Sequence, residues 1–191
     1  MTVVADDRRK QILMAATACF AKHGFHQSSM QEICRQADLS PGSVYRYYRS
    51  KDDLIAALID DYRQATCAMF VAAREEPDVV AAIVRMAEAM LSDIDPLHFE
   101  CTAEAVRNPR VGKLVREFDA EAVAELAELI RIGQKKKRID KKLDPVTTAH
   151  TLVAMIDGLM WRKFIDPNAD VASLLGTIRT LVERFLYPAR S

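Results

Sequence analysis

The sequence predicts an all-α protein built from nine helices. Half of its 191 residues are hydrophobic, while Gly (6) and Pro (7) are few, which favours helices around a substantial core. Apolar residues recur at intervals of three and four along most of the chain, and no segment shows the strict alternation that marks a strand. A helical protein of this length has room for one large domain or two small ones.

The first predicted helix covers residues 11–20 and buries one face. Four residues recur on that face at helical spacing: Ile12, Ala16, Cys19 and Phe20. Gly24 follows at a position where it can end the helix in a left-handed turn, with Phe25 packing back against it. We therefore expect the chain to change direction at residue 24.

Three more helix starts follow within residues 28–53. Each is marked by a serine that can cap a first turn: Ser29, Ser40 and Ser50. Glu32 stands at capping-box spacing from the first of them, and Asp53 repeats that spacing after the third with a shorter acid. Pro41 suits a first helical position, where its missing N–H leaves nothing unsatisfied. A very short helix over residues 41–48 is therefore expected between two longer ones.

The remaining apolar periodicity completes the nine helices. It predicts helices over residues 51–76, 79–94, 97–106, 109–133, 145–164 and 171–186. Pro77 and Pro96 end the first two of these, and Asn108 with Pro109 supplies a cap and a first residue for the fourth. We predict a helix-turn-helix domain over residues 1–50 and a second helical domain over residues 51–191. No internal repeat is present.

A helix, a tight turn, a short helix and a third helix form the plan of a helix-turn-helix DNA reader. The stretch also resembles the DNA-binding domain of the TetR family of bacterial transcriptional regulators. Three motifs carry the resemblance: Gly24-Phe25, Tyr45-Arg46-Tyr47-Tyr48 and Ser50-Lys51-Asp52-Asp53-Leu54. Asp38 departs from the family's usual Gly in the turn, a position that can require a left-handed backbone, which Asp tolerates. Cys34 replaces a common Ala and should alter only packing.

Charge is distributed unevenly along the chain. Residues 8–51 hold eight Lys or Arg against two acids, a net charge of +6, whereas the whole chain is neutral and its remainder carries −6. A basic end on an acidic body suits phosphate binding at one end only. Candidate DNA contacts are Ser28, Ser29, Pro41, Gly42, Ser43, Tyr45, Arg46, Tyr47 and Lys51.

These candidates have different roles. Arg46 can make a bidentate contact to guanine, although a solvated surface charge is the alternative. The resemblance places Lys51 on a phosphate, and Tyr45 and Tyr47 near the backbone or bases; a packing ring is the alternative for Tyr47. Ser28 or Ser29 could hold a phosphate at the start of its helix. One short reader covers few base pairs, so we expect a dimer on a palindromic double-stranded operator.

The last two helices carry wide apolar stripes. Their members are Leu152, Val153, Ile156, Leu159, Met160, Leu174, Leu175, Ile178, Leu181, Val182, Phe185 and Leu186. Such stripes exceed what one face of a surface helix buries. The resemblance implies that these helices pair with those of a second copy as a homodimer interface. The alternative is that both stripes belong to the core of one chain.

The resemblance also implies a small-molecule pocket in the second domain whose occupancy releases DNA. Candidate lining residues are Tyr62, Met69, Met86, Met90, His98, Phe99, Cys101, Met155 and Trp161, which suit an ordinary core equally well. Glu100, Glu104 and Asp157 would favour a cationic ligand if they point inward, whereas a Glu104–Arg107 surface salt bridge is the alternative for one of them. Residues 103–109 and 157–159 are similar to a TetR subgroup that includes choline-linked regulators, a subgroup too varied to name the ligand.

Other patterns narrow the function further. Four separated cysteines, Cys19, Cys34, Cys67 and Cys101, have no zinc spacing, so we expect reduced thiols, no metal and no cofactor. No nucleophile elbow or phosphate loop is present, and we expect no catalytic residue and no enzyme. No apolar run approaches the ~20 residues of a membrane span and no signal peptide is visible, which predicts a cytoplasmic protein without membrane contact.

The sequence thus predicts a dimeric repressor that a small molecule releases from its operator. Two alternatives are a DNA-binding regulator controlled by a protein partner or by thiol oxidation, and a helical carrier or enzyme with a vestigial reader. A basic run over residues 135–142 is interpreted as a solvated helix end, with a nonspecific DNA contact as its alternative.

Overall fold

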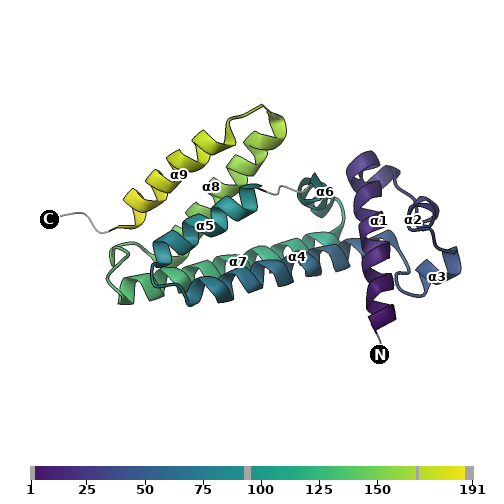
Figure 1. The fold of residues 1–191 in the computed structure, drawn as a ribbon, viewed down its shortest axis with the longest axis horizontal. Coiled ribbons are helices and arrows are strands. Elements are labelled where there is room, and N and C mark those ends of the chain that lie inside the picture. The colour runs from purple at the N-terminus through teal and green to yellow at the C-terminus, as the bar shows by residue number, and fades with distance from the viewer. Residues whose placement is uncertain (1–2, 93–95, 167, 188–191) are drawn as a thin grey trace. The chain divides into compact units, whose positions relative to one another are not determined.

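The computed structural model describes residues 3–92, 96–166 and 168–187, and over these ranges it contains nine helices and no strand (Figure 1). The predicted all-α class is confirmed. The helices are α1 Val3–Gln27, α2 Met30–Gln36, α3 Pro41–Tyr45, α4 Lys51–Arg74, α5 Val79–Ser92, α6 Pro96–Ala105, α7 Pro109–Lys135, α8 Pro145–Ile165 and α9 Val171–Leu186. None of the helices within the described ranges combines the length and apolar character that a membrane span requires.

The helices pack into two compact units. The first unit comprises residues 1–64 and 95–118, and so contains α1–α3, the first half of α4, α6 and the start of α7. The second comprises residues 65–94 and 119–191. Packing therefore groups α6 with the reader helices, whereas the domain boundary predicted at residue 50 follows the chain and stays a prediction.

The core of the first unit is built from every helix that enters it. Its buried apolar residues include Ile12, Ala16, Phe20, Ile33, Val44, Leu54, Ile55, Leu97 and Val111. All four residues of the face predicted for α1 are buried, with Cys19 5% exposed and Ile12, Ala16 and Phe20 fully buried. The first turns of α1 were not expected, because residues 7–10 are exposed and carry no apolar periodicity.

The predicted helix starts of the reader are confirmed. Ser29 Oγ accepts the Glu32 N–H at 3.1 Å, and Ser40 Oγ accepts the Ser43 N–H at 3.2 Å. Ser50 Oγ accepts the Asp53 N–H at 3.2 Å at the start of α4. Each cap satisfies a backbone donor that a helix start leaves free.

The turns differ from expectation in detail. Asp38 adopts the predicted left-handed backbone, with a φ of 52°. Gly24 has a φ of 74° but a ψ of 162°, a region open essentially to glycine alone, so the chain kinks there instead of forming a left-handed turn. Phe25 packs back as expected, with its ring centroid 5.3 Å from that of Phe20. Helix α3 ends at Tyr45 because Val44 O accepts both the Tyr47 and Tyr48 N–H groups in a tightened turn.

The second unit holds a separate core. Residues from α4, α5, α7, α8 and α9 contribute to it, among them Phe70, Ile83, Leu129, Ile130, Leu152, Ile178 and Leu186. Helix α5 packs against both α8 and α9. This core accounts for part of the apolar stripes on the last two helices.

Candidate DNA-binding and ligand-binding sites

Two buried side chains, one on α3 and one in the turn that follows it, fix the position of the surface that would face DNA. Val44 is fully buried and Tyr48 is 4% exposed, which anchors this segment to α1 and α2. Pro41, Gly42 and Arg46 are exposed, and Ser43 is half-buried. A Cβ added at Gly42 would meet nothing within 4 Å, so this part of α3 is open to close approach by a partner.

Arg46 and Tyr47 form one structural pair at the end of the reader. The Arg46 guanidinium carbon lies 5.4 Å from the centroid of the Tyr47 ring, and Tyr47 is half-buried against the core of the first unit. Tyr45 is 45% exposed. Tyr47 therefore packs against the core and is also partly exposed. Its ring contacts the Arg46 guanidinium and so orients that side chain in the absence of DNA.

The two serines before α2 face different ways. Ser28 is buried, and its hydroxyl donates to Cys19 O at 3.0 Å and Gly24 O at 2.9 Å. Ser29 is exposed and caps α2. Of the two hydroxyls, that of Ser29 is the one on the surface.

Lys51 ties the start of α4 to the segment between α1 and α2. Its Nζ donates to Phe25 O at 2.7 Å and to His26 O at 3.2 Å, and lies 4.6 Å from the centroid of the Phe25 ring. An ammonium has three N–H donors, so one is left for a phosphate. Lys51 thus holds the reader together in addition to the phosphate contact predicted for it.

Helix α6 holds the same segment through two carboxylates. Glu100 Oε2 accepts the Phe25 N–H at 3.1 Å, and Glu104 Oε2 lies 3.0 Å from His26 Nε2. The Glu104 side chain is only 6% exposed, and this oxygen has no hydrogen-bond partner among the described residues, so His26 Nε2 is the polar group that faces it. We call residues 24–28 with these contacts the α1–α2 turn.

An apolar cavity lies on another side of α6, within the first unit. It has a volume of about 70 Å³ and is lined by Leu58, Ile59, Tyr62, Leu97, His98, Cys101, Thr102, Val115 and Phe118. The Tyr62 and Phe118 rings meet edge to face with centroids 5.8 Å apart, and the His98 ring lies 6.1 Å from that of Tyr62. Among the residues that the structure describes, no carboxylate, Lys or Arg lines this cavity.

Comparison with known proteins agrees with this geometry. The family model "Bacterial regulatory proteins, tetR family" matches residues 12–58, and the model "BetI-type transcriptional repressor, C-terminal" matches residues 81–187, more than half of the chain. The chain belongs to the TetR family. The resemblance seen in the sequence is confirmed, and the protein is a DNA-binding transcriptional regulator with a helix-turn-helix reader.

Three relatives show how far the similarity extends. The transcriptional regulator UidR of Escherichia coli K12 is 28% identical over 188 residues, covering 95% of this chain and 94% of its own. The structure of Salmonella enterica GusR matches with a TM-score of 0.83 and 31% identity, over 94% of this chain and 95% of that one. The nicotine-responsive repressor HdnoR of Paenarthrobacter nicotinovorans is 24% identical, covering 88% and 89% of the two chains.

The residues predicted to bind a ligand are divided among several places in this TetR-family regulator. Tyr62, His98 and Cys101 line the cavity, and Phe99 packs edge to face on His98 with centroids 5.6 Å apart. Met69 and Met86 instead border an open hollow of the second unit, with a volume of about 180 Å³. The sequence did not single out the aliphatic lining residues, because their helical spacing is also that of a core.

The other predicted ligand residues lie apart from these hollows. Met155 packs against the core of the second unit, and Met90 is half-buried on α5. Trp161 is 49% exposed and stacks on Phe164 with centroids 5.8 Å apart. Asp157 is exposed on α8, and Glu100 and Glu104 hold the α1–α2 turn, so the condition for a cationic ligand is not met by the cavity lining.

The stripes on α8 and α9 of the TetR-family regulator are only partly covered. Leu152, Ile156 and Met160 are buried on α8, as are Ile178, Val182 and Leu186 on α9. The large apolar side chains that remain exposed are Val146 at 43%, Trp161 at 49%, Phe164 at 49%, Ile165 at 53%, Leu181 at 52% and Phe185 at 43%. The intrachain core therefore explains one side of these helices and leaves the other without cover.

The four cysteines are free thiols. Burial raises the pKa of the Cys19 and Cys34 thiols, which keeps them protonated, while Cys67 is exposed and Cys101 half-buried. Within the described ranges no group of three or more His, Cys, Asp or Glu side chains is arranged to hold a metal ion.

Proposed function

We propose that this TetR-family regulator is a dimeric cytoplasmic repressor that leaves a palindromic operator when a small neutral ligand enters the cavity of the first unit. One observation carries the proposal: helix α6 both walls the cavity and holds the α1–α2 turn of the reader. Leu97, His98 and Cys101 face the cavity. Glu100 and Glu104 contact the turn.

The helical geometry explains how one short helix can do both. Successive residues of a helix are about 100° apart, so the pair Leu97 and Cys101 shares one side and the pair Glu100 and Glu104 shares another. The two sides are adjacent on the same rigid element. A displacement of α6 away from the cavity must therefore alter the two carboxylate contacts with the reader.

The size of the cavity supports such a displacement. Its volume of about 70 Å³ is roughly half of the ~150 Å³ cavity that accepts benzene in a protein core. An aromatic guest can enter only if the walls move, and α6 is one of them. By linkage, a ligand that weakens DNA binding through this movement binds the DNA-free protein more tightly by the same factor.

The lining indicates the class of ligand. Apolar side chains dominate, and polar atoms come from Tyr62, His98, Cys101 and Thr102 alone. The Thr102 hydroxyl already donates to His98 O at 2.9 Å. Because burying a charge without a partner is costly, this lining favours a neutral, largely aromatic molecule. The name of the relative HdnoR, a nicotine-responsive repressor, supports control by a small molecule.

The DNA-bound form follows from the reader and from the uncovered apolar side chains. We assign Arg46 to a guanine and Lys51 to a phosphate, with Ser29, Pro41, Gly42, Ser43, Tyr45 and Tyr47 as further contacts. Trp161, Phe164, Leu181 and Phe185 are exposed on α8 and α9, and burial against a second copy would cover them. Two readers in one dimer fit two half-sites.

Genomic fragment selection followed by ligand titration tests the proposal. DNA fragments retained by the purified protein supply the operator, and neutral aromatic compounds are then screened for a rise in thermal midpoint and for release of that operator. Val115→Phe fills the cavity and should abolish the response. Met69→Phe, at the open hollow, should keep it. A response retained by Val115→Phe would move the ligand elsewhere and reject this site.

A further inference from the structure

The corner between α6 and α7 carries charge that the proposed repressor function does not use. Residues 105–116 contain four cations, Arg107, Arg110, Lys113 and Arg116, and no acid. All four side chains are exposed, Lys113 by 72% and Arg110 by 57%. We propose that this corner is a second DNA-backbone surface, which adds phosphate contacts beside those of the reader.

The corner is fixed to the reader by packing within the first unit. Leu97 before the corner and Val111 within it are buried in the same core as Val44 of α3. Leu97 is 8% exposed, and the other two are fully buried. A reader seated in the major groove therefore sets the position of the corner relative to the duplex.

A charge pair adds a second attachment at the start of α4. Arg110 Nη2 donates to Asp53 Oδ1 at 2.8 Å, and Asp53 Oδ2 accepts the Arg49 N–H at 3.1 Å. Arg49 is the exposed cation that follows the reader's tyrosines. Asp53 thus joins Arg110 of the corner to the backbone of Arg49, which follows the reader, and the two basic segments lie next to each other.

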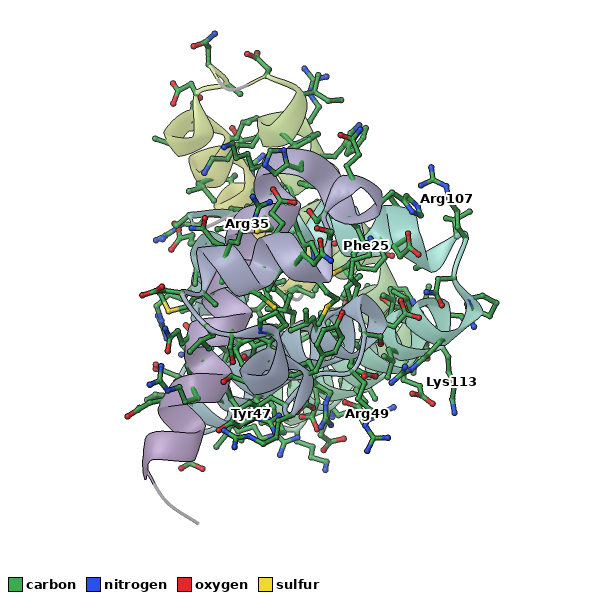
Figure 2. The ribbon with its side chains drawn as sticks, turned by 90° about the vertical axis from the view of Figure 1, so that its right-hand side faces the viewer. Phe25, Arg35, Tyr47, Arg49, Arg107 and Lys113 are labelled. Carbon is green, nitrogen blue, oxygen red and sulfur yellow. The ribbon has the colours of Figure 1, made fainter. Side chains whose placement is uncertain are left out.

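Figure 2 shows this continuity. Tyr47 and Arg49 are in the lower part of the view, Lys113 projects to the right of Arg49, and Arg107 projects on the same side well above Lys113. These labelled side chains point outward from the ribbon. Basic groups therefore pass from the reader onto the corner without leaving this end of the first unit.

The acids near the corner leave most of its charge available. Arg110 is offset by Asp53, and Lys113 has only a loose contact of 3.7 Å with the exposed Glu117. Glu104 is turned inward to His26. Within the described residues no ion pair or side-chain hydrogen bond involves the Arg107 guanidinium. Exposed cations in this position can replace condensed counterions on a phosphate backbone, which is the source of salt-dependent DNA affinity.

The decisive measurement is the salt dependence of binding to a duplex of random sequence, about 30 bp long, by fluorescence anisotropy between about 50 and 200 mM salt. Arg107→Gln with Lys113→Gln should reduce the slope of log K against log salt by about 0.9 for each phosphate that is no longer neutralised, roughly 1.8 per bound protomer. Restoring charge with Arg107→Lys and Lys113→Arg should restore the slope.

A matched control separates a local phosphate contact from a change in net charge. Arg74→Gln with Arg85→Gln removes the same two charges from exposed positions of the second unit, outside the basic run over residues 135–142, and should leave the slope at the wild-type value. Thermal unfolding of both double variants should match the wild type, since the replaced side chains are on the surface. An unchanged slope in the Arg107/Lys113 variant, or an equal fall in the control, would overturn the proposal. Neither result depends on the ligand or on release from an operator.

Discussion

The α1–α2 turn and the uncovered side of α8 and α9 present opposite kinds of side-chain chemistry. In the first unit, Lys51, Glu100 and Glu104 fix the turn through individual polar contacts of 2.7–3.1 Å. In the second unit, the corresponding surface consists of large apolar side chains such as Leu181 and Phe185. Polar contacts are directional and worth little net free energy each, whereas apolar burial is non-directional and additive in area.

This difference indicates which contacts can act as a switch. A few polar contacts can be exchanged for contacts with water at a small net cost, so a ligand can release the turn. The apolar surface through which we propose dimerisation would resist such exchange and stay closed in both states. We therefore expect substitutions at α9 to abolish assembly, and substitutions at the turn to shift an equilibrium.

The largest effect is expected from placing charge on the α9 surface. Leu181→Glu with Phe185→Glu should remove about 3 kcal/mol or more of apolar burial and make the protein monomeric, lowering operator affinity by roughly 100-fold. Light scattering after size exclusion and anisotropy measure the two effects. Ala172→Glu, on the exposed first turn of α9, should leave both unchanged. A dimer that survives the double substitution would exclude this surface.

Arg46→Ala should have the next largest effect. Removing a bidentate guanine contact costs about 1–3 kcal/mol and should relax sequence preference, as read by binding to an operator and to a shuffled duplex. Lys51→Ala should instead weaken binding to both duplexes alike, because it removes a phosphate contact and the hold on Phe25 O. Equal loss of discrimination in the two variants would contradict the assignment.

Glu104→Gln should produce a smaller, reciprocal effect. Gln lacks the carboxylate charge that faces His26 Nε2, so the turn loosens and operator affinity should fall severalfold without a change in sequence preference. Ligand affinity for the DNA-free protein should rise, because the loosened turn favours the displaced position of α6 that the ligand requires, and calorimetry can measure this rise. Glu75→Gln, at an exposed site of the second unit, serves as the control. A change in operator affinity with no change in ligand affinity would disconnect the turn from the cavity.

The smallest effect is expected from the titration of Asp53 at the start of α4, which makes the stability of the fold depend on pH. The Arg110 hydrogen bond, helped by the Arg49 N–H and Ser50, lowers the pKa of Asp53 below its ordinary value, against a partial opposing effect of burial. A depressed carboxyl pKa adds stability above the unfolded-state pKa of about 3.9, and this stability is lost as pH falls through the folded-state pKa.

The corresponding variant tests this dependence directly. Asp53→Asn should lower the thermal midpoint at neutral pH by a small amount, because the pair is partly exposed, and the difference from wild type should vanish in acid. Asp52→Asn shares the first turn of α4 and controls for the loss of a charge near the helix start. A difference that persists unchanged in acid would remove the ion pair as its cause.

The sequence predicted the local parts of this protein well. The caps at Ser29 and Ser40 and the left-handed Asp38 depend on neighbouring residues, and each was found where its type and spacing placed it. The end of α3 was missed because the tightened turn at Val44 is set by the burial of Tyr48 against other helices. The residues next to Val44 in the sequence do not indicate how Tyr48 packs against other helices.

The cavity was harder to predict because α4, α6 and α7 form it together. Met and aromatic residues drew attention as lining candidates, yet they serve equally in cores, and Trp161 is exposed on α8. Leu58, Val115 and Phe118 line the cavity with the same spacing as core residues. The contact of Glu100 with Phe25 joins residues 75 positions apart, a separation that periodicity does not address.

The kink at Gly24 has a further consequence for how the reader is controlled. In an uninterrupted helix, the N–H of Phe25 would bond to a carbonyl of its own helix and could not bond to another element. The positive φ of Gly24 turns that N–H outward, where Glu100 accepts it. Any side chain at position 24 would strain this backbone, and its Cβ would lie 3.6 Å from Glu100 Oε2. Gly24, which is outside the proposed DNA and ligand contacts, thus frees the Phe25 N–H through which α6 holds the α1–α2 turn.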